Sequence, residues 1–503
     1  MKKYYITTPI YYVNDVPHIG HAYTSIASDV LARFKKLDGY KVFFLTGTDE
    51  HGQKVEIASK NKNVEPIEFV NNVSKNFQSL SDTLNLSNND FIRTTEKRHI
   101  ISCQKLWKEL EKSGNIYLDK YSGWYSVRDE AFYSENELIE GKAPTGADVE
   151  WVEEPSYFFK LSNWQNELLN HYEENENFIL PMSRRNEVIS FVKGGLKDLS
   201  ISRTSFNWGV PVPNDEKHIM YVWLDALTNY ITATGYSSDD SKHNTFWPAD
   251  LHVVGKDILR FHAVYWPAFL MAANLPLPKR IFAHGWWTNE GEKISKSVGN
   301  VIDPVKLIND YGLDQVRYFL IREVPFGNDG DFSKNNLIQR INSDLANSLG
   351  NLFQRVITFS MKNCDGKVPA HNNELNNKDR ELIDSITNEL NDIKNLIEFQ
   401  KLDDVLKIIW LKISNSNKYI DEQAPWNLKE TNQKRMNVIL YCLIESIRQL
   451  GILIQPFLPY AASNILDALS VSSDQRLFEH LKNNIHPGVL LKKPDQLFPR
   501  VNE

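Results

Sequence analysis

The chain has 503 residues, of which 42% are hydrophobic and 12% aromatic, a composition that supports a sizeable core and excludes an intrinsically disordered protein. Its length corresponds to roughly three or four structural units. Its formal net charge of −7 excludes a broadly basic nucleic-acid-binding protein, so any contact with RNA must use local positive patches.

The cysteines and the apolar segments indicate a cytoplasmic protein. Cys103, Cys364 and Cys442 are far apart and odd in number, which fits a reducing compartment and gives neither a disulfide framework nor a thiolate metal cluster. The N-terminus runs directly into a predicted strand without an apolar signal segment. The most apolar stretch, residues 261–275, is interrupted by Pro267 and is too short to span a bilayer.

The first predicted elements are a strand, a turn and a helix. Residues 3–8 are rich in aromatic and β-branched side chains, as in a buried strand, and apolar residues recur at helical spacing over 26–34. The stretch from 7 to 21 is therefore predicted to be a strand-to-helix turn. Such turns form ligand crevices in open α/β sheets.

Two histidines and a glycine lie at the predicted start of this helix. His18 and His21 are three residues apart, so both side chains should project from one face, and Gly20 leaves room for a flat base against the backbone. The helix N-terminus adds N–H groups and the positive end of a dipole, which suit a phosphate. The alternative is a loop with two incidental histidines.

A second buried strand is predicted over residues 41–45, and residues 46–52 turn off its carboxyl end, where α/β sheets bind ligands. Helices are predicted near 66–86 and 97–113. Together, residues 1–115 are predicted to form the first half of a nucleotide-binding domain.

The following residues, 116–220, differ in composition. Gly, Trp, Tyr and Glu are frequent and the pattern changes every few residues, which predicts an inserted small α/β module. Short apolar runs at 220–224, 251–255 and 280–284 then predict that the sheet resumes. Residues 221–285 are therefore assigned to the second half of the nucleotide-binding domain.

A linking region over residues 286–340 contains the sequence Glu-Lys-Ile-Ser-Lys-Ser at 292–297. Lys293 and Lys296 place two ammonium groups three residues apart beside two hydroxyls, which suits a mobile loop that grips polyphosphate. The alternative is an exposed basic turn.

Beyond residue 340 the pattern is helical. Apolar residues recur at three- and four-residue spacing in three stretches, 382–397, 402–413 and 439–454, and Pro456 ends the last one. Such stripes are usually the core of a bundle. Residues 341–503 are therefore predicted to form a helical domain.

The sequence His-Ile-Gly-His at 18–21, followed far downstream by Lys-Ile-Ser-Lys-Ser, resembles the class I aminoacyl-tRNA synthetases. From residue 4 to about residue 460 the chain resembles the methionyl-tRNA synthetase family in particular. The resemblance implies an α/β Rossmann-type catalytic domain. An inserted α/β connective peptide splits this domain, and an α-helical anticodon-binding bundle follows it.

Amino-acid activation joins a carboxylate to the α-phosphate of ATP, and this carboxylate, with a pKa of about 3.5, is already ionised at neutral pH. The enzyme must supply alignment and positive charge. The resemblance implies that the two histidines donate to the transferring phosphate and the two lysines neutralise pyrophosphate. The implied ATP site consists of His18, Gly20, His21, Asp257, Lys293 and Lys296, with Mg²⁺ held mainly by phosphates and water.

The resemblance also implies a methionine site. Asp49 would hold the substrate ammonium, and apolar and aromatic walls would suit the flexible thioether. The wall residues are Ile10, Tyr12, Trp223, Ala226, Tyr230, Phe261 and His262. The alternatives are plain core residues and an ordinary turn aspartate. Relatives often have proline where this chain has Leu227, which affects the fine shape of the pocket.

Many relatives bind zinc in the connective peptide through paired Cys-x-x-Cys knuckles. Here residues 126–129 place serine and aspartate at the knuckle positions, and no cysteine occurs between Cys103 and Cys364. We therefore expect a zinc-free form.

The helical domain carries a candidate RNA-reading set. Asn347, Asn351 and Arg355 recur at four-residue intervals and Trp426 follows a proline, so amides, a guanidinium and a stacking face are available for an unstacked loop. In methionyl enzymes the matching residues read the anticodon CAU. The alternatives are a solvated helix face for the asparagines and a core position for the tryptophan.

The predicted activity is that of a methionine–tRNA ligase acting on initiator and elongator methionine tRNAs, as a monomer and without a membrane. Sister enzymes for isoleucine, valine or leucine need a large editing insertion, for which roughly a hundred inserted residues leave little room. The cysteine enzyme needs zinc ligands. The remaining alternatives are an inactive RNA-binding paralogue and a small-molecule nucleotidyltransferase.

Overall fold

The computed structural model describes residues 1–13, 16–129, 131–238, 241–294, 299–371 and 374–502. The chain forms two compact units. One, the sheet unit, consists of Lys3–Pro17 and Phe43–His284. The other, the helical unit, consists of Met1–Lys2, His18–Val42 and Gly285–Glu503.

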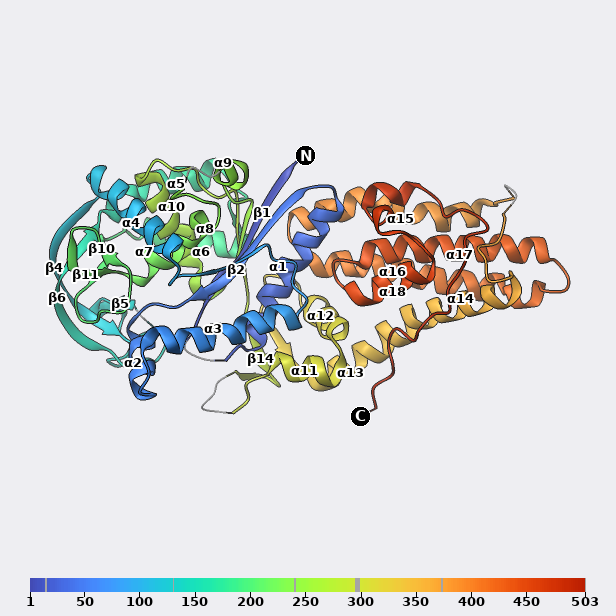
Figure 1. Ribbon diagram of the computed structural model, residues 1–503, viewed down its shortest axis with the longest axis horizontal. Helices are drawn as coiled ribbons and strands as arrows, with labels where there is room; N and C mark the ends of the chain where they lie inside the picture. The colour runs from blue at the N-terminus through green and yellow to red at the C-terminus, as the bar shows by residue number, and fades with distance from the viewer. Residues whose placement is uncertain (14–15, 130, 239–240, 295–298, 372–373, 503) are drawn as a thin grey trace. The chain divides into compact units, whose positions relative to one another are not determined.

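The sheet unit is built on a six-stranded sheet of order β3-β2-β1-β12-β13-β7. Figure 1 labels β1 and β2 of this sheet. Its strands are β1 Lys3–Tyr12, β2 Lys41–Asp49, β3 Asp90–Arg93, β7 Ile179–Leu180, β12 Leu251–Gly255 and β13 Ile281–His284. The β2–β3, β1–β12, β12–β13 and β13–β7 pairs are parallel. Strand order reverses between β1 and β12, and ligands bind at the carboxyl ends of strands beside such a reversal.

Helices of this unit account for much of its core. They are α2 Gln53–Asn61, α3 Pro66–Thr83, α4 Lys97–Lys112, α5 Gln165–Glu174, α6 Met182–Lys193, α7 Val222–Leu227, α8 Asn229–Thr232, α9 Ser241–Phe246 and α10 Trp266–Ala272. The helices predicted near 66–86 and 97–113 are confirmed as α3 and α4. Trp107 of α4 and Trp266 of α10 are fully buried in the large hydrophobic cluster of this unit.

A four-stranded antiparallel sheet of order β5-β4-β6-β8 occupies much of the predicted insertion. Its strands are β4 Ile116–Ser126, β5 Ala131–Tyr133, β6 Glu150–Phe159 and β8 Leu199–Ser200, and a smaller sheet holds β9 Ser202–Arg203, β10 Pro211–Val212 and β11 Asp215–Met220. The insertion is not wholly separate, because β7, inside residues 116–220, is an edge strand of the main sheet.

One sequence expectation was wrong. Residues 220–224 were predicted to continue the catalytic sheet, but β11 ends at Met220, pairs with β9 and β10 in the small sheet, and is followed by the helix α7. A short apolar run fits a buried strand and a buried helix equally well, so its periodicity could not distinguish the two. The strands β1 and β2 also extend further than predicted, to Tyr12 and Asp49.

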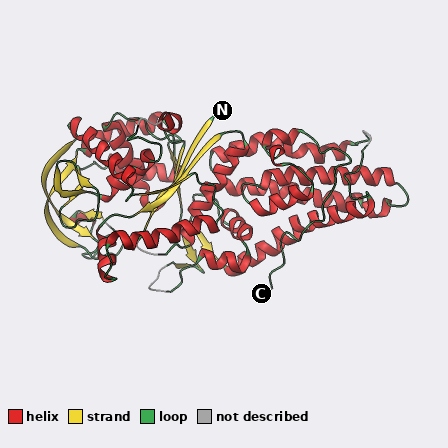
Figure 2. Cartoon of the chain, in the orientation of Figure 1, coloured by secondary structure: helices red, strands yellow, loops and turns green. Residues whose placement is uncertain are grey.

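The helical unit contains α1 Ile19–Leu37, α11 Pro304–Tyr311, α12 Leu313–Arg322, α13 Lys334–Arg340, α14 Asn351–Asn363, α15 Asn377–Glu398, α16 Leu402–Gln423, α17 Gln433–Ile454 and α18 Pro459–Ala468. A π-helical segment, η5 Ile341–Gly350, joins α13 to α14. Figure 2 shows that helices dominate the residues from α13 onward. A small sheet holds β14 Trp287–Asn289, β15 Glu292–Lys293 and β16 Gly330–Phe332.

The predicted apolar stripes form the core of this bundle. They lie on α15, α16 and α17, which contact one another. Within the described residues, α17 is the helix long and apolar enough to cross a membrane, and 94% of its most apolar window is buried inside the bundle. Its composition is therefore explained by its central place in the fold.

Helix α1 is tied to the rest of the helical unit by ion pairs. Asp29 and Arg317 are both fully buried and their charged groups are 2.7 Å apart, and Arg317 also donates to the carbonyls of Pro456 and Phe457. Lys35 pairs with Glu398 of α15 at 2.9 Å. The helix that begins with the histidine motif is thus anchored to the bundle.

Candidate functional site

The histidine pair opens α1. His18 is the N-cap residue, and its Nδ1 accepts the Gly20 N–H at 3.1 Å. The His18 N–H in turn donates to Nδ1 of His21 at 3.1 Å, and the two ring centroids are 3.9 Å apart. The expectation that both side chains share one face is therefore confirmed.

This capping arrangement fixes the tautomers. Because Nδ1 of each ring accepts a backbone N–H, each neutral imidazole carries its proton on Nε2. Burial, followed by the neighbouring His18, lowers the pKa of His21 well below its ordinary value. His21 is therefore a neutral hydrogen-bond donor at a helix N-terminus, where anions bind.

Gly20 also has a structural reason to lack a side chain, besides the room that it is expected to leave for a base. A Cβ at this position would lie 2.9 Å from Cε1 of His18, so the space above the glycine is taken by the histidine ring. The missing side chain thus permits the cap itself.

Three residues predicted for methionine lie at the carboxyl ends of β1 and β2. Ile10 and Tyr12 are half-buried on β1, and Asp49, the last residue of β2, is 7% exposed. The Val13 N–H donates to the Asp49 carbonyl at 3.1 Å, which joins the two strand ends. The Lys54 ammonium lies 4.9 Å from the centroid of the Tyr12 ring.

The predicted aromatic wall is assembled from three helical segments. Trp223 of α7 stacks on Phe261 with ring centroids 3.6 Å apart and an interplanar angle of 8°. Tyr230 of α8 and His262 are hydrogen-bonded at 2.7 Å between the phenol and Nε2. Phe261 and His262 belong to a π-helix, η4 Phe261–Tyr265, a distortion that is frequent at functional sites.

His262 is held as a neutral acceptor. Its Nδ1–H donates to the Ile258 carbonyl at 2.9 Å, so Nε2 accepts the proton of the Tyr230 hydroxyl. Burial lowers the pKa of His262 to about 4, outweighing the opposing effects of the Ile258 carbonyl and Asp257. The ring therefore adds no charge to this apolar wall at neutral pH.

The structure brings most of the predicted methionine residues together. Ile10, Trp223 and Phe261 pack against the hydrophobic cluster that contains Tyr230, and Ala226 is buried one turn after Trp223 on α7. Tyr12 packs instead against a second cluster.

Asp257 lies just beyond β12, in the short helix η3 Lys256–Ile258. A Cβ on Gly255 would lie 2.5 Å from its Oδ1, so the glycine allows the carboxylate to fold back over the strand end. This is the strand next to the reversal in strand order, which is the position expected for a nucleotide contact.

The lysine motif is described only in part. The backbone of Lys293 pairs with Thr288 in the β14–β15 hairpin. Lys296 lies outside the described residues, together with the serines at 295 and 297. The histidine pair and the lysine motif belong to the helical unit, whereas the methionine residues and Asp257 belong to the sheet unit.

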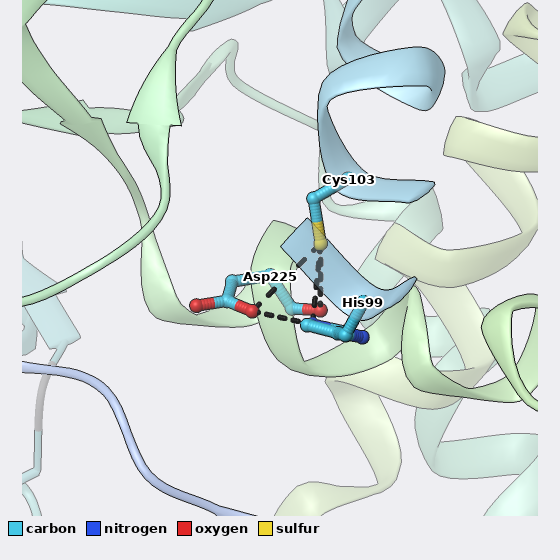
Figure 3. A group of neighbouring side chains, drawn as sticks. All are labelled: His99, Cys103 and Asp225. Carbon is cyan, nitrogen blue, oxygen red and sulfur yellow. Dashed lines mark hydrogen bonds and ion pairs between the residues drawn. The ribbon is translucent and has the colours of Figure 1, made fainter. Parts of the chain in front are cut away.

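Sequence reasoning missed a buried polar network around Asp225 of α7. Figure 3 shows Asp225 facing His99 and Cys103, which both come from α4. The carboxylate is 2.6 Å from Nδ1 of His51 and 2.7 Å from Nε2 of His99, and all these side chains are buried. The sequence offered one signal for this network. His51 and Asp225 lie in the same short stretches as Asp49 and Ala226, which were predicted to bind methionine.

His99, Cys103 and Asp225 are metal-ligand types whose candidate atoms lie within 4.8 Å of one another. Their spacing is that of hydrogen bonds, since ligands about 2.0 to 2.3 Å from a tetrahedral zinc must stand further apart than the 2.7 Å between Nε2 and the carboxylate. Burial, reinforced by Asp225, also raises the pKa of the Cys103 thiol well above its ordinary value. A protonated thiol is a poor zinc ligand.

The proposed RNA-reading residues lie on the helical unit. Asn347 of η5 and Asn351 of α14 are exposed. Arg355 pairs with Asp421 at 2.8 Å, and its guanidinium lies 5.5 Å from the centroid of the Trp426 ring. Trp426, in the short helix η6 Pro425–Leu428, is 43% exposed, which rules out the alternative of a core position.

Comparisons with known proteins agree along the whole chain. Residues 4–150 and 145–357 match the family model for class I tRNA synthetases (M), and residues 368–503 match that for the anticodon binding domain of methionyl tRNA ligase. The methionine–tRNA ligases of Rickettsia felis and Rhizobium meliloti are 58% and 52% identical to it, each over 99% of this chain and 98% of the relative.

Solved structures give the same answer. The Mycobacterium tuberculosis methionyl-tRNA synthetase in complex with methionyl-adenylate is 50% identical, covers 99% of this chain with 100% of its own, and superposes with a TM-score of 0.97. The apo form of that enzyme superposes with a TM-score of 0.91 at 47% identity, over 100% of this chain and 99% of its own. The chain therefore belongs to the methionine–tRNA ligases, a family of class I tRNA synthetases.

Proposed function

We propose that this chain activates methionine with ATP and transfers it to initiator and elongator methionine tRNAs. The observation that carries the proposal is the pair of capped histidines at the start of α1, in a chain of this family. Neutral imidazoles with their protons on Nε2 are suited to donating hydrogen bonds to phosphate without holding the product by a full charge.

In the first step, a methionine carboxylate oxygen attacks the α-phosphorus. The new P–O bond forms while the bond to the bridging oxygen breaks, and pyrophosphate leaves. His18 and His21 stabilise the α-phosphate oxygens, Lys293 and Lys296 the departing pyrophosphate, and Gly20 and Asp257 complete the ATP site. Mg²⁺ comes with ATP and neutralises phosphate charge, held by the phosphates and water.

Methionine binds through charge at one end and dispersion at the other. Asp49 takes the ammonium, and the stacked Trp223 and Phe261 provide polarizable surface for the sulfur. Sulfur–aromatic contacts are worth about 0.3 to 1.5 kcal/mol each. The wall is completed by Ile10, Tyr12, Ala226, Tyr230 and His262.

In the second step, a hydroxyl oxygen of the terminal tRNA ribose attacks the carbonyl carbon of the adenylate. The bond from that carbon to the phosphate oxygen breaks, AMP leaves, and the hydroxyl proton passes to the departing phosphate or to water. We assign anticodon reading to Asn347, Asn351, Arg355 and Trp426. The exposed indole beside a guanidinium supports this assignment, since such groups stack on unpaired bases.

We also propose five functional regions. They are the two catalytic halves at 1–115 and 221–285, the connective peptide at 116–220 with β7 contributed to the main sheet, the stem-contact region at 286–340 and the anticodon-binding domain at 341–503. We further propose a monomer that acts in the cytoplasm without zinc, on the basis of the cysteine positions and the buried α17.

Amino-acid-dependent ATP–pyrophosphate exchange tests the function. Purified protein should exchange with methionine and not with isoleucine, valine, leucine or cysteine, and should then charge methionine tRNA. Exchange with another amino acid would identify a sister enzyme. RNA binding without exchange would identify an inactive paralogue.

A further inference from the structure

We propose that Asp225 is a positioning residue for the methionine site. Through His51 it holds the turn that carries Asp49, and through α7 it fixes that turn against the wall that contacts the side chain of methionine. The inference rests on the proposed function, since it assumes that Asp49 binds the substrate ammonium.

The contacts of Asp225 join segments far apart in the sequence. Its Oδ2 accepts from Nδ1 of His51 at 2.6 Å, and its Oδ1 accepts from Nε2 of His99 at 2.7 Å. His99 also lies 3.3 Å from the Thr232 hydroxyl through its other ring nitrogen. One carboxylate therefore connects the turn after β2 with α4, α7 and α8, and it lies on the same short helix as Trp223 and Ala226.

The other polar groups of the turn are also held by the protein. Glu50, fully buried, accepts two hydrogen bonds from Arg93 at 2.6 and 2.9 Å and others from Thr48 and Thr95. Its backbone carbonyl accepts from Nε1 of Trp208 at 2.6 Å. Glu50 and His51 are thus committed to internal contacts, and these contacts determine where the adjacent Asp49 stands.

The Asp225 carboxylate suits this role because it accepts two hydrogen bonds at once. Burial alone would raise the pKa of Asp225, but His51 and His99 outweigh burial and hold it well below its ordinary value. The ionised group accepts from both imidazoles, and charge-assisted hydrogen bonds are short and strong. An amide would offer a single acceptor oxygen, so one of the two histidines would lose its partner.

The consequence concerns one part of the ligand. If the network places Asp49, its loss should weaken recognition of the ammonium group more than recognition of the thioether. The ratio of the Kd of 4-(methylthio)butanoate, which lacks the amino group, to the Kd of methionine measures this preference. A general loosening of the pocket would raise both constants and leave the ratio unchanged.

The test uses the full chain and calorimetric titration of both compounds. Asp225→Asn and His51→Ala should lower the ratio by about 10- to 100-fold, as expected for a misplaced binding group. His51→Asn should keep most of the wild-type ratio, because the amide N–H can replace the Nδ1–H donor. The control is His218→Gln, a buried histidine of β11 that contacts Ser202 at 2.9 Å; its ratio should match wild type.

A double-mutant cycle with Asp49→Asn completes the test. If Asp225 acts through Asp49, the effects of the two changes on methionine affinity should be clearly less than additive. Additive effects, or an unchanged ratio in a variant that melts at a lower temperature, would overturn the proposal and leave Asp225 as a stabilising residue only. If Asp225→Asn does not fold, the comparison of His51→Ala with His51→Asn tests the proposal. The ratio should fall in the first variant and stay near wild type in the second, and equal ratios would overturn the proposal. Wild-type protein without methionine-dependent exchange would instead overturn the proposed function.

Discussion

At the scale of single residues, burial and backbone hydrogen bonds decide which histidines carry charge. His21 is half-buried and His262 is fully buried, each has Nδ1 bonded to the backbone, and desolvation lowers the pKa of each. Their hydrogen bonds to the backbone run in opposite directions, because Nδ1 of His21 accepts a hydrogen bond whereas Nδ1–H of His262 donates one. The same residue type therefore gives a donor at the start of α1, where we propose that phosphate binds, and an acceptor in the aromatic wall.

The low pKa of His262 should be visible in the stability of the protein. The pKa of His262 is about 4 in the folded state, whereas its ordinary value is 6.5. The contribution of the neutral ring to the free energy of unfolding is therefore present above pH 6.5 and is lost as the pH falls towards 4. Between pH 7.5 and 5 the loss should be about 2 kcal/mol. Urea unfolding of wild type and His262→Gln at both pH values measures it, and an equal pH dependence in the two proteins would contradict the argument.

The role of Lys296 can be separated from folding by its effect on two steps. If Lys296 neutralises charge that develops on pyrophosphate, Lys296→Ala should leave methionine affinity intact and slow adenylate formation by about a hundredfold or more. Calorimetry and pyrophosphate exchange measure the two quantities. The matched control is Lys306→Ala on α11, whose exposed ammonium pairs with Asp310. Parallel losses of affinity and rate for Lys296→Ala would mean a structural role.

At the scale of elements, sequence patterns succeeded where the signal was long and local. The stripes of α15, α16 and α17 each extend over three turns or more, so their period identified them before their partners were known. The run at 220–224 was too short for that. The helix α7 that follows Met220 carries Asp225, whose contacts with α4 and with the turn after β2 no local pattern contains.

The anchoring of α1 gives an element-scale prediction. Arg317→Met removes one of the two guanidinium partners of the buried Asp29, which keeps Arg33 at 2.7 Å, and it takes the Arg317 donor from the Pro456 and Phe457 carbonyls. The change should cost about 2 to 3 kcal/mol. The control is Lys378→Ala, which breaks an exposed pair with Glu422 at 3.2 Å and should cost about 1 kcal/mol or less. Thermal melting of both variants measures the difference, and equal effects would show that burial of the Asp29–Arg317 pair does not matter.

At the scale of the whole molecule, the residues that we propose for one reaction belong to two units that the sequence interleaves. The chain passes from the sheet unit to the helical unit after Pro17, directly before His18, and again after His284, ahead of the lysine motif. The histidine and lysine motifs from which we propose the ATP site could be found in the sequence, because each motif is local. Motif spacing could not find the Asp225 network, which joins residues 51, 99 and 225.

The zinc-free state is a prediction about the whole chain. Elemental analysis of chelator-washed protein should find well below one zinc per chain. The motivation is that structural zinc sites rely on thiolate and imidazole ligands, and the three cysteines lie far apart in the sequence. One tightly held zinc that disappears in Cys103→Ser would mean that His99, Cys103 and Asp225 rearrange to bind metal.

The last prediction separates the two activities of the molecule through Trp426→Ala. Stacking of one base on an aromatic ring is worth about 1 to 3 kcal/mol, or roughly 5- to 150-fold in affinity for tRNA. Trp426 is exposed on the helical unit beside Arg355, so its loss should change the melting temperature little. Methionine-dependent pyrophosphate exchange without tRNA should stay near normal, while charging of methionine tRNA falls at limiting tRNA.

The control for this variant is Trp151→Ala, because Trp151 of β6 is a comparably exposed tryptophan at 52% that lies outside the regions proposed to contact tRNA. A loss of tRNA affinity confined to Trp426→Ala would support base stacking, since both variants remove an exposed indole. Normal charging by Trp426→Ala would contradict the anticodon assignment. So would a loss of charging that follows unfolding, because an indole that is 43% exposed should not support the core.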